Sequence, residues 1–235
     1  MSSAYNPHGA AMLDYFNGNL SATVICVQDG ERDDVPVAVW FRETPFPAEQ
    51  LALDLCRGRV LDLGAGAGIH TLELQRRGLD VAAIDIAPEC VQIMKRRGVK
   101  NAQAADLYAF EGGPFDTIIC LCNGLDKVGR LSDLPRFLAR MRGLLASGGQ
   151  LLADSADLRA FATPEREAEF ARKQAAGRYY GELDMVFEYT GVRGEPFTVL
   201  QVDSATLTEH ARANAWECEV LSEENGHYLA RLTPR

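Results

Sequence analysis

The chain has 235 residues, of which 47% are hydrophobic and 24% charged, an ordinary balance for a globular protein. This length suits one domain with additions and is long enough to bury a substantial core. The formal charge is −9, from 24 Lys and Arg against 33 Asp and Glu, and the sequence contains no basic block. The composition therefore disfavours nucleic acid as a partner.

The N-terminus lacks the charged-then-apolar pattern of a secretory signal, and no apolar run is long enough to span a bilayer. Six cysteines show neither CxxC spacing nor the Cys/His pairs of zinc sites. Most of them lie in apolar runs, which is typical of reduced thiols in a cytosolic protein. We expect a cytoplasmic protein with no membrane partner and no metal site.

The first 57 residues precede the main α/β pattern. Residues 9–16 and 47–56 have the pattern of short helices, and 22–27 and 35–41 are rich in β-forming residues. The connection over 28–34 contains the turn pair Asp29-Gly30 but is longer than a two-residue hairpin loop. We expect residues 1–57 to form a helix-and-hairpin extension that covers the active site.

The most informative stretch is residues 60–68, Val-Leu-Asp-Leu-Gly-Ala-Gly-Ala-Gly. An apolar run enters an acid, Asp62, then glycines at alternate positions, and a helical pattern follows from Ile69. This order predicts a strand, a tight turn and a helix N-terminus, the opening of a nucleotide-binding fold. The next apolar run, 81–84, ends in Asp85, an acid placed to bind ribose hydroxyls.

The glycine loop fits neither phosphate-binding pattern. A dinucleotide fingerprint needs a third glycine where the chain has Ile69, and a P-loop needs a lysine after its last glycine, where the chain has Ile69-His70. The carboxylate of Asp62 would repel a pyrophosphate but attract an ammonium group. The remaining matching ligand is S-adenosylmethionine, and the stretch resembles motif I of the class I S-adenosylmethionine-dependent methyltransferases.

The resemblance continues in order along the chain. Pro88 suits the first turn of a helix, and residues 99–105 predict a strand that ends at Asp106-Leu107. Residues 115–123 resemble the family's fourth strand, and 144–152 resemble its helix, Gly-Gly turn and fifth strand. The resemblance implies a Rossmann-like α/β fold with a seven-stranded sheet and helices on both faces, over 58–235. A redox or kinase-like Rossmann domain is the alternative.

The last third of the chain contains an insertion. Thr163-Pro164-Glu165 predicts the start of a helix that runs to about residue 176, and 182–190 with 197–202 predict a hairpin. A capping box at 206–209 predicts the last helix, and 216–221 with 227–232 the closing antiparallel pair. In the family such insertions cap the acceptor pocket, so we expect 163–203 to form a cap. The hairpins could instead extend a sheet or form a dimer contact.

The resemblance assigns S-adenosylmethionine-binding roles residue by residue. Asp62 would lie near the ammonium group, with the loop backbone and the helix start beside the carboxylate. Asp85 would bind the ribose, Ile86 one face of the adenine, and Asp106 with Leu107 the adenine edge. The full set of predicted cofactor-binding residues is Asp62, Gly64, Ala65, Gly66, Gly68, His70, Asp85, Ile86, Asp106, Leu107, Cys122 and Asn123.

The acceptor side is less defined, because methyl transfer from a sulfonium needs orientation more than any universal catalytic group. Amino-methylating relatives often carry an Asn/Asp-Pro-Pro-aromatic motif after the fourth strand, and residues 123–126, Asn-Gly-Leu-Asp, depart from it. The catalytic residue stays unknown. The candidates are Asn123, Asp126, Asp157 and Tyr180.

The leading hypothesis is a methyltransferase that methylates an oxygen or nitrogen of a small molecule and releases S-adenosylhomocysteine. One alternative is a protein or peptide methyltransferase, and another is a non-catalytic S-adenosylmethionine-binding regulatory protein. An aminopropyl transferase would show acids for a polyamine, which the sequence lacks. The protein could be a monomer or a homodimer.

Overall fold

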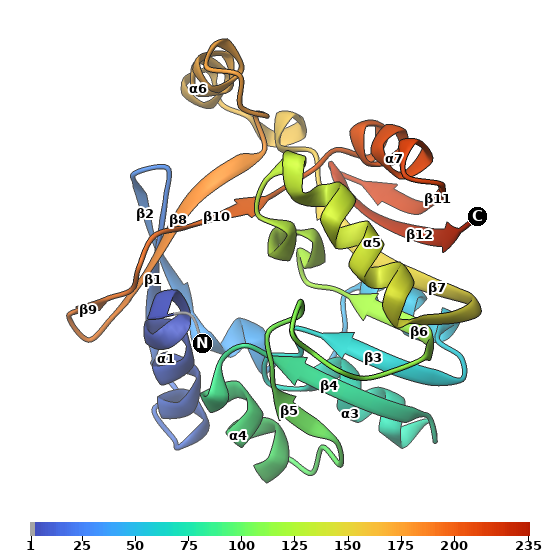
Figure 1. Ribbon diagram of the computed structural model, residues 1–235. Coiled ribbons are helices and arrows are strands. Elements are labelled where there is room, and N and C mark those ends of the chain that lie inside the picture. The colour runs from blue at the N-terminus through green and yellow to red at the C-terminus, as the bar shows by residue number, and fades with distance from the viewer. Residues whose placement is uncertain (1–2) are drawn as a thin grey trace. The chain divides into compact units, whose positions relative to one another are not determined.

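The structure is a computed structural model that describes residues 3–235 and has an α/β fold (Figure 1). Its larger sheet has seven strands in the order β11-β12-β7-β6-β3-β4-β5. Their bounds are β3 Arg59–Leu63, β4 Asp80–Asp85, β5 Ala102–Ala104, β6 Phe115–Cys120, β7 Leu145–Ala156, β11 Trp216–Glu224 and β12 His227–Pro234. The predicted Rossmann-like seven-stranded sheet is confirmed.

The pairing in this sheet is mixed. β4 runs parallel to both β3 and β5, and β7 runs parallel to β6. β12 pairs antiparallel with β7, and β11 antiparallel with β12. The buried strands β3, β4 and β6 read as near-continuous apolar runs, as expected for strands covered on both faces.

The chain forms two compact units, which we describe separately. The first comprises the residues up to 112 together with 184–197, and the second comprises 113–183 and 198–235.

The first unit contains α1 (Asn6–Phe16), α2 (Pro47–Leu55), α3 (Ile69–Arg76) and α4 (Pro88–Arg96). α1 lies beside α4 (Figure 1), where Met12 joins a buried cluster with Cys90 and Ile93. Gly9 allows this approach, since an added Cβ would lie 2.6 Å from Glu89 Oε2. The predicted helices over 9–16 and 47–56 are confirmed.

A second sheet has the order β10-β8-β1-β2, with the short β9 paired to β8. The strands are β1 (Thr23–Gln28), β2 (Glu31–Pro36), β8 (Glu182–Tyr189), β9 (Val192–Arg193) and β10 (Phe197–Leu200). β8 lies antiparallel to β1, with Ile25 opposite Glu188 and Gln28 opposite Met185. The two hairpins that the sequence places far apart therefore form one sheet.

The predicted strand over 35–41 and its long loop are wrong. Asp29 and Gly30 both have positive φ, 52° and 91°, and form a two-residue turn that pairs Gln28 with Glu31. The turn thus fixes a polar, exposed strand, Glu31–Pro36, whereas the apolar segment Val37–Trp40 forms a 3₁₀ turn. The tight turn, and not the apolar pattern, therefore sets the register between β1 and β2.

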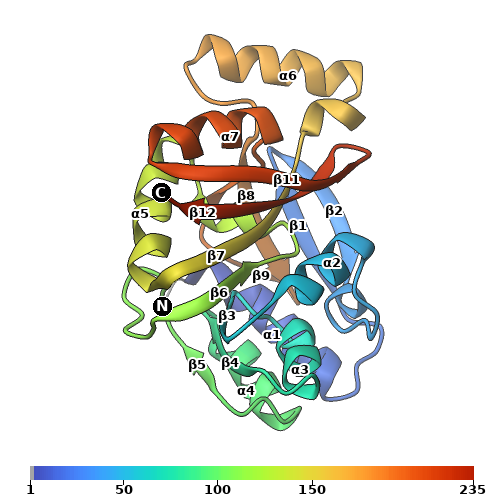
Figure 2. The same ribbon diagram turned by 90° about the vertical axis from the view of Figure 1, so that its right-hand side faces the viewer.

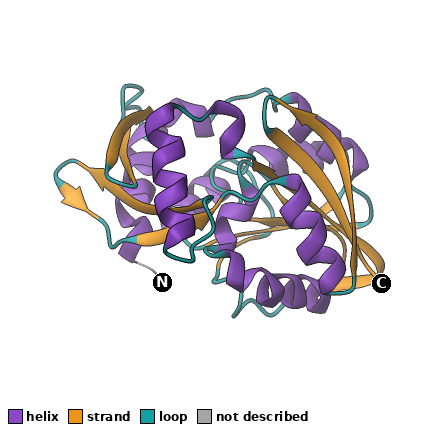
Figure 3. Cartoon of the chain, turned by 90° about the horizontal axis from the view of Figure 1, so that it is seen from above, coloured by secondary structure: helices purple, strands orange, loops and turns teal. Residues whose placement is uncertain are grey.

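The second unit contains α5 (Leu134–Leu144), α6 (Pro164–Ala175) and α7 (Ser204–Ala213). α7 packs along β11 (Figure 2), and β12, which pairs antiparallel with β11, leads to the C-terminus (Figure 3). The predicted capping box at 206–209 is wrong, because α7 begins at Ser204 and Asp203 caps it by accepting from Thr206 N. Among residues 3–235, no helix has the length and apolarity needed to cross a membrane.

Candidate functional site

The glycine loop joins β3 to α3 in the first unit. Gly64, Gly66 and Gly68 all have positive φ, at 73°, 54° and 79°, which residues with a Cβ rarely adopt. The N–H groups of Gly64 and Ala65 donate to Ile84 O at 2.8 and 3.0 Å. An added Cβ on Gly66 would meet no atom within 4 Å, so open space lies against the loop there.

Asp85 holds the loop in shape. Its Oδ2 accepts from Gly66 N at 2.8 Å and its Oδ1 accepts from Ala87 N at 2.9 Å. The loop N–H groups predicted to meet a ligand are therefore bonded within the chain.

Asp62 is 2% exposed, and its Oδ2 accepts from Thr71 Oγ1 at 2.6 Å. Thr71 is fully buried on α3, so this contact ties the strand before the loop to the helix after it. Sequence reasoning identified Asp62 but not Thr71. A threonine nine residues after the acid, on the first turn of the helix, was the available signal.

His70 belongs to a buried charged cluster with Glu49 of α2 and Arg42. Glu49 is 2% exposed and accepts from Phe46 N at 2.9 Å and from Arg42 Nη2. His70 Nε2 lies 3.4 Å from Glu49 Oε2 and makes no hydrogen bond of good geometry, and Arg42 Nε is also buried without a partner. Burial alone would raise the pKa of Glu49, but the contacts of His70, Arg42 and Phe46 N outweigh it and lower that pKa to about 2.

The remaining predicted residues of this unit follow β4 and β5. Ile86 and Leu107 are partly buried. Asp106 is exposed, and its Oδ1 accepts from Tyr108 N at 2.7 Å, which makes it the acid of a tight turn.

In the second unit, β6 ends in an unusual turn. Cys122 and Asn123 both have positive φ, 64° and 56°, and both are exposed. Asp154 of β7 holds this turn, accepting from Cys122 N at 3.0 Å and from Gly124 N at 2.6 Å. Sequence reasoning missed Asp154, although an acid directly after the buried run 151–153 was visible.

Asp126 follows this turn, in the 3₁₀ segment Gly124–Val128, and is partly buried. Gln201 Nε2 donates to Asp126 Oδ1, while Gln201 Oε1 is buried and has no hydrogen-bond partner. Burial raises the pKa of Asp126 to about 8; the charge of Asp154 adds to this, and Lys127 and the Gln201 hydrogen bond oppose it.

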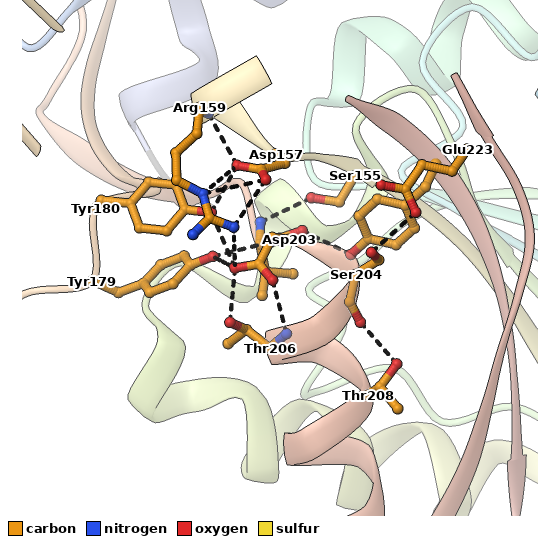
Figure 4. Close-up of polar contacts among 12 residues, drawn as sticks. Ser155, Asp157, Arg159, Tyr179, Tyr180, Asp203, Ser204, Thr206, Thr208 and Glu223 are labelled. Atoms are coloured by element: carbon orange, nitrogen blue, oxygen red, sulfur yellow. Dashed lines mark hydrogen bonds and ion pairs between the residues drawn. The ribbon is translucent and has the colours of Figure 1, made fainter. Parts of the chain in front are cut away.

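Asp157 and Tyr180 lie in a polar network shown in Figure 4. Tyr180 OH lies 2.9 Å from Asp157 Oδ1 and 3.0 Å from Asp203 Oδ2. Asp203 also accepts from Tyr179 OH at 2.6 Å and from Thr206 N and Oγ1 at 2.9 and 2.7 Å. The network joins the end of β7 to the start of α7.

Arg159 is the cation that lies beside both carboxylates of this network. Arg159 Nη2 lies 2.9 Å from Asp157 Oδ2 and 3.7 Å from Asp203 Oδ2 (Figure 4). Burial would raise the pKa of Asp203, but the hydrogen bonds of Tyr179, Thr206 and Tyr180 lower it to about 2. These carboxylates are thus committed to partners within the chain.

No group of three or more His, Cys, Asp or Glu side chains is placed to hold a metal ion within residues 3–235. Cys90 and Cys120 are buried, and Cys122 is the exposed one of the six thiols.

The chain is similar to proteins of a known family. A methyltransferase domain family matches residues 60–149. A solved structure of a methyltransferase from Bacteroides fragilis, in complex with S-adenosylhomocysteine, is 35% identical to the chain. That similarity covers 100% of this chain and 97% of the other, with a TM-score of 0.88.

Two groups of curated relatives match over part of the chain. The ubiquinone biosynthesis O-methyltransferase of Xanthomonas oryzae pv. oryzae is 36% identical over 107 residues, 42% of this chain and 43% of the relative. The magnesium-protoporphyrin O-methyltransferase of Rhodobacter capsulatus is 38% identical over 74 residues, 29% of this chain and 33% of the relative. The chain thus spans less than half the length of these relatives.

The Bacteroides structure matches the whole chain, and 35% identity over that length is enough to assign the two proteins to one family. The chain belongs to the class I S-adenosylmethionine-dependent methyltransferases, as the glycine loop and strand order indicate.

Proposed function

We propose that the chain binds S-adenosylmethionine and moves its methyl group to an oxygen or nitrogen of a small molecule, releasing S-adenosylhomocysteine. The observation that carries the proposal is the acid-bound glycine loop, in which Asp85 fixes Gly66 and open space lies against Gly66. The full-length similarity to a protein captured with S-adenosylhomocysteine supports the same donor.

The first unit would hold the donor. Asp62 suits its ammonium group, and the partly buried Asp85 and Ile86 suit the ribose and adenine. Arg42, which an ion pair with Glu49 holds in place, suits a carboxylate on donor or substrate. The adenine role of Asp106 and Leu107, and the roles of Cys122 and Asn123, stay predictions.

Methyl transfer from a sulfonium requires little from the protein beyond orientation of the donor and the acceptor. The sulfonium already activates the methyl carbon, so holding donor and acceptor in line in a dry pocket lowers the barrier most, by up to about 7–11 kcal/mol. We propose that residues 1–57 and 163–203 serve this purpose as a cover over the core. Strands from both segments form the sheet β10-β8-β1-β2, which supports a shared role.

Calorimetric titration of the chain with S-adenosylmethionine, S-adenosylhomocysteine, NAD and ATP tests the donor. We expect the first two to bind, and Asp85→Ala to weaken binding by at least about 1 kcal/mol, roughly fivefold. Asp80→Ala is the matched control, because Asp80 begins the same strand with a side chain 73% exposed. Uptake of NAD or ATP without uptake of S-adenosylmethionine would refute the assignment.

A further inference from the structure

A cluster of polar side chains follows the end of β6, and donor binding in the first unit does not use it. It is built by Asp126 and Lys127 after β6, Asp154 of β7, and Gln201 directly after β10. All four belong to the second compact unit.

We propose that Asp126 takes up the proton that the methyl acceptor loses, and that Gln201 is a positioning residue that holds the Asp126 carboxyl for this step. The proposal rests on the methyltransferase function proposed above.

The first support is the way in which Gln201 is fixed. Gln201 is 6% exposed, and its backbone N donates to Gly181 O at 2.8 Å. Gly181 permits this close approach, because an added Cβ there would lie 1.8 Å from Gln201 O. The backbone of Gln201 is therefore fixed, which restricts where its side-chain amide can lie beside Asp126.

The second support is the unpartnered amide oxygen. Gln201 uses one amide atom on Asp126 and leaves Oε1 buried without a hydrogen bond. Turning the amide around would only exchange the two atoms, so one of them stays available in either orientation. A buried polar atom without a partner is costly, and a polar group of a bound ligand would satisfy it.

The third support is the charge around Asp126. The charges that act on Asp126 are those of Lys127 on the same segment and Asp154 on β7, while Cys120 and Cys122 at the end of β6 act on Lys127. Asp154 is bonded to Cys122 N and Gly124 N, whereas Asp126 has the one amide contact with Gln201. Burial and the Asp154 charge place the pKa of Asp126 at about 8, close to the range in which a general base works well.

The step balances as follows. The lone pair of the acceptor oxygen or nitrogen forms the bond to the methyl carbon, and the carbon–sulfur bond breaks with its electron pair left on sulfur. The proton of the acceptor passes to the Asp126 carboxylate, which later releases it to solvent. The products are the methylated acceptor and S-adenosylhomocysteine.

The test measures S-adenosylhomocysteine release by the full chain from pH 6 to 10, with a catechol, a phenol and a primary amine as probes. We expect kcat/KM of the wild type to rise with pH up to about 8. Asp126→Asn should lower it by about 100-fold or more and remove this limb, with donor affinity changed less than twofold. Asp133→Asn is the control, since Asp133 lies in the same unit, at the start of α5, and makes no capping hydrogen bond.

The variant Gln201→Met tests whether Gln201 positions the Asp126 carboxyl or only stabilises the fold. Loss of its hydrogen bond should raise the pKa of Asp126, so the limb should move to higher pH while kcat/KM falls less than in Asp126→Asn. Full activity and an unchanged pH profile in Asp126→Asn would overturn the inference alone. Donor binding without S-adenosylhomocysteine release from any probe by the wild type would overturn the proposed function and the inference with it.

Discussion

Asp203 and Asp126 are two carboxylates of the second unit. The pKa of Asp203 is lowered, whereas that of Asp126 is raised. Asp203 accepts hydrogen bonds from two tyrosine hydroxyls and from two groups of Thr206, and its pKa falls to about 2. Asp126 accepts from Gln201, and its pKa rises to about 8. Burial raises both pKa values, but at Asp203 the hydrogen-bond donors outweigh it, whereas at Asp126 burial is stronger, the charge of Asp154 adds to it, and one amide opposes it with Lys127.

The comparison separates a structural acid from one that is suited to chemistry. A carboxylate surrounded by donors stabilises the fold and has no capacity left for a substrate. A carboxylate with one partner destabilises the fold when it is ionised but can exchange a proton near neutral pH. The candidates Asp157 and Tyr180 fall on the structural side, because both contact partners in the Asp203 network.

The largest effect should come from Asp203→Ala. Three donors, Tyr179 OH and the N and Oγ1 of Thr206, lose their acceptor and α7 loses its N-cap, so the free energy of unfolding should fall by about 3–4 kcal/mol. Urea denaturation at pH 7 measures it. Asp133→Ala, at an N-cap without a side-chain bond, should change it by less than about 0.5 kcal/mol. Equal losses in the two variants would show that Asp203 stabilises the fold no more than an ordinary N-cap residue.

Asp126→Asn should raise the free energy of unfolding, and the size of this increase should depend on pH. The raised pKa of Asp126 means that between about pH 4 and 8 the unfolded chain is ionised there while the folded chain holds the proton. Stability of the wild type therefore falls as pH rises through this window and levels off above it. The variant lacks this loss, so its advantage over the wild type should grow by at least about 2 kcal/mol from pH 5 to pH 8.

The same denaturation curves recorded at pH 5 and pH 8 test this. A constant difference between the two proteins would show that Asp126 titrates at an ordinary pKa. The expected result also means that loss of activity in Asp126→Asn does not arise from unfolding.

Tyr179→Phe should have the smallest effect. The hydroxyl donates to Asp203 Oδ2 at 2.6 Å and accepts from Asp203 N at 3.0 Å, so its loss should cost about 1 kcal/mol at pH 7. Asp203 contributes stability above its unfolded pKa of about 4 and loses that contribution as pH falls through about 2. The cost should therefore shrink at pH 2.

Tyr15→Phe provides the matched control for this hydroxyl, because the Tyr15 ring packs on Phe41 at a centroid distance of 4.7 Å. We expect it to change stability by less than about 0.5 kcal/mol at either pH. A cost of Tyr179→Phe that stays the same at pH 2 would argue against an ionised Asp203.

Local patterns predicted the core of this molecule. The glycine loop, the strands that flank it and Asp85 follow from neighbouring residues, because a strand, turn and helix start are specified within about ten positions. Asp126 was identified in the same way, as an acid just after a buried strand.

The partners of these residues could not be predicted. Asp154 binds the turn at Cys122 and Gly124 from about 30 residues away, and Gln201 reaches Asp126 from 75 residues away. Such contacts depend on how strands are ordered in the sheet, which no local spacing encodes. The error at β2 had a different cause, since the tight turn at Asp29-Gly30 overrode the apolar pattern that followed.

The pairing of β1 with β8 also affects how the protein is made. Ile25 lies opposite Glu188, so one edge of the first hairpin has no partner until most of the chain has been synthesised. During translation this strand edge stays open to pairing with other nascent chains. A chaperone that binds early chain segments would protect it until β8 emerges.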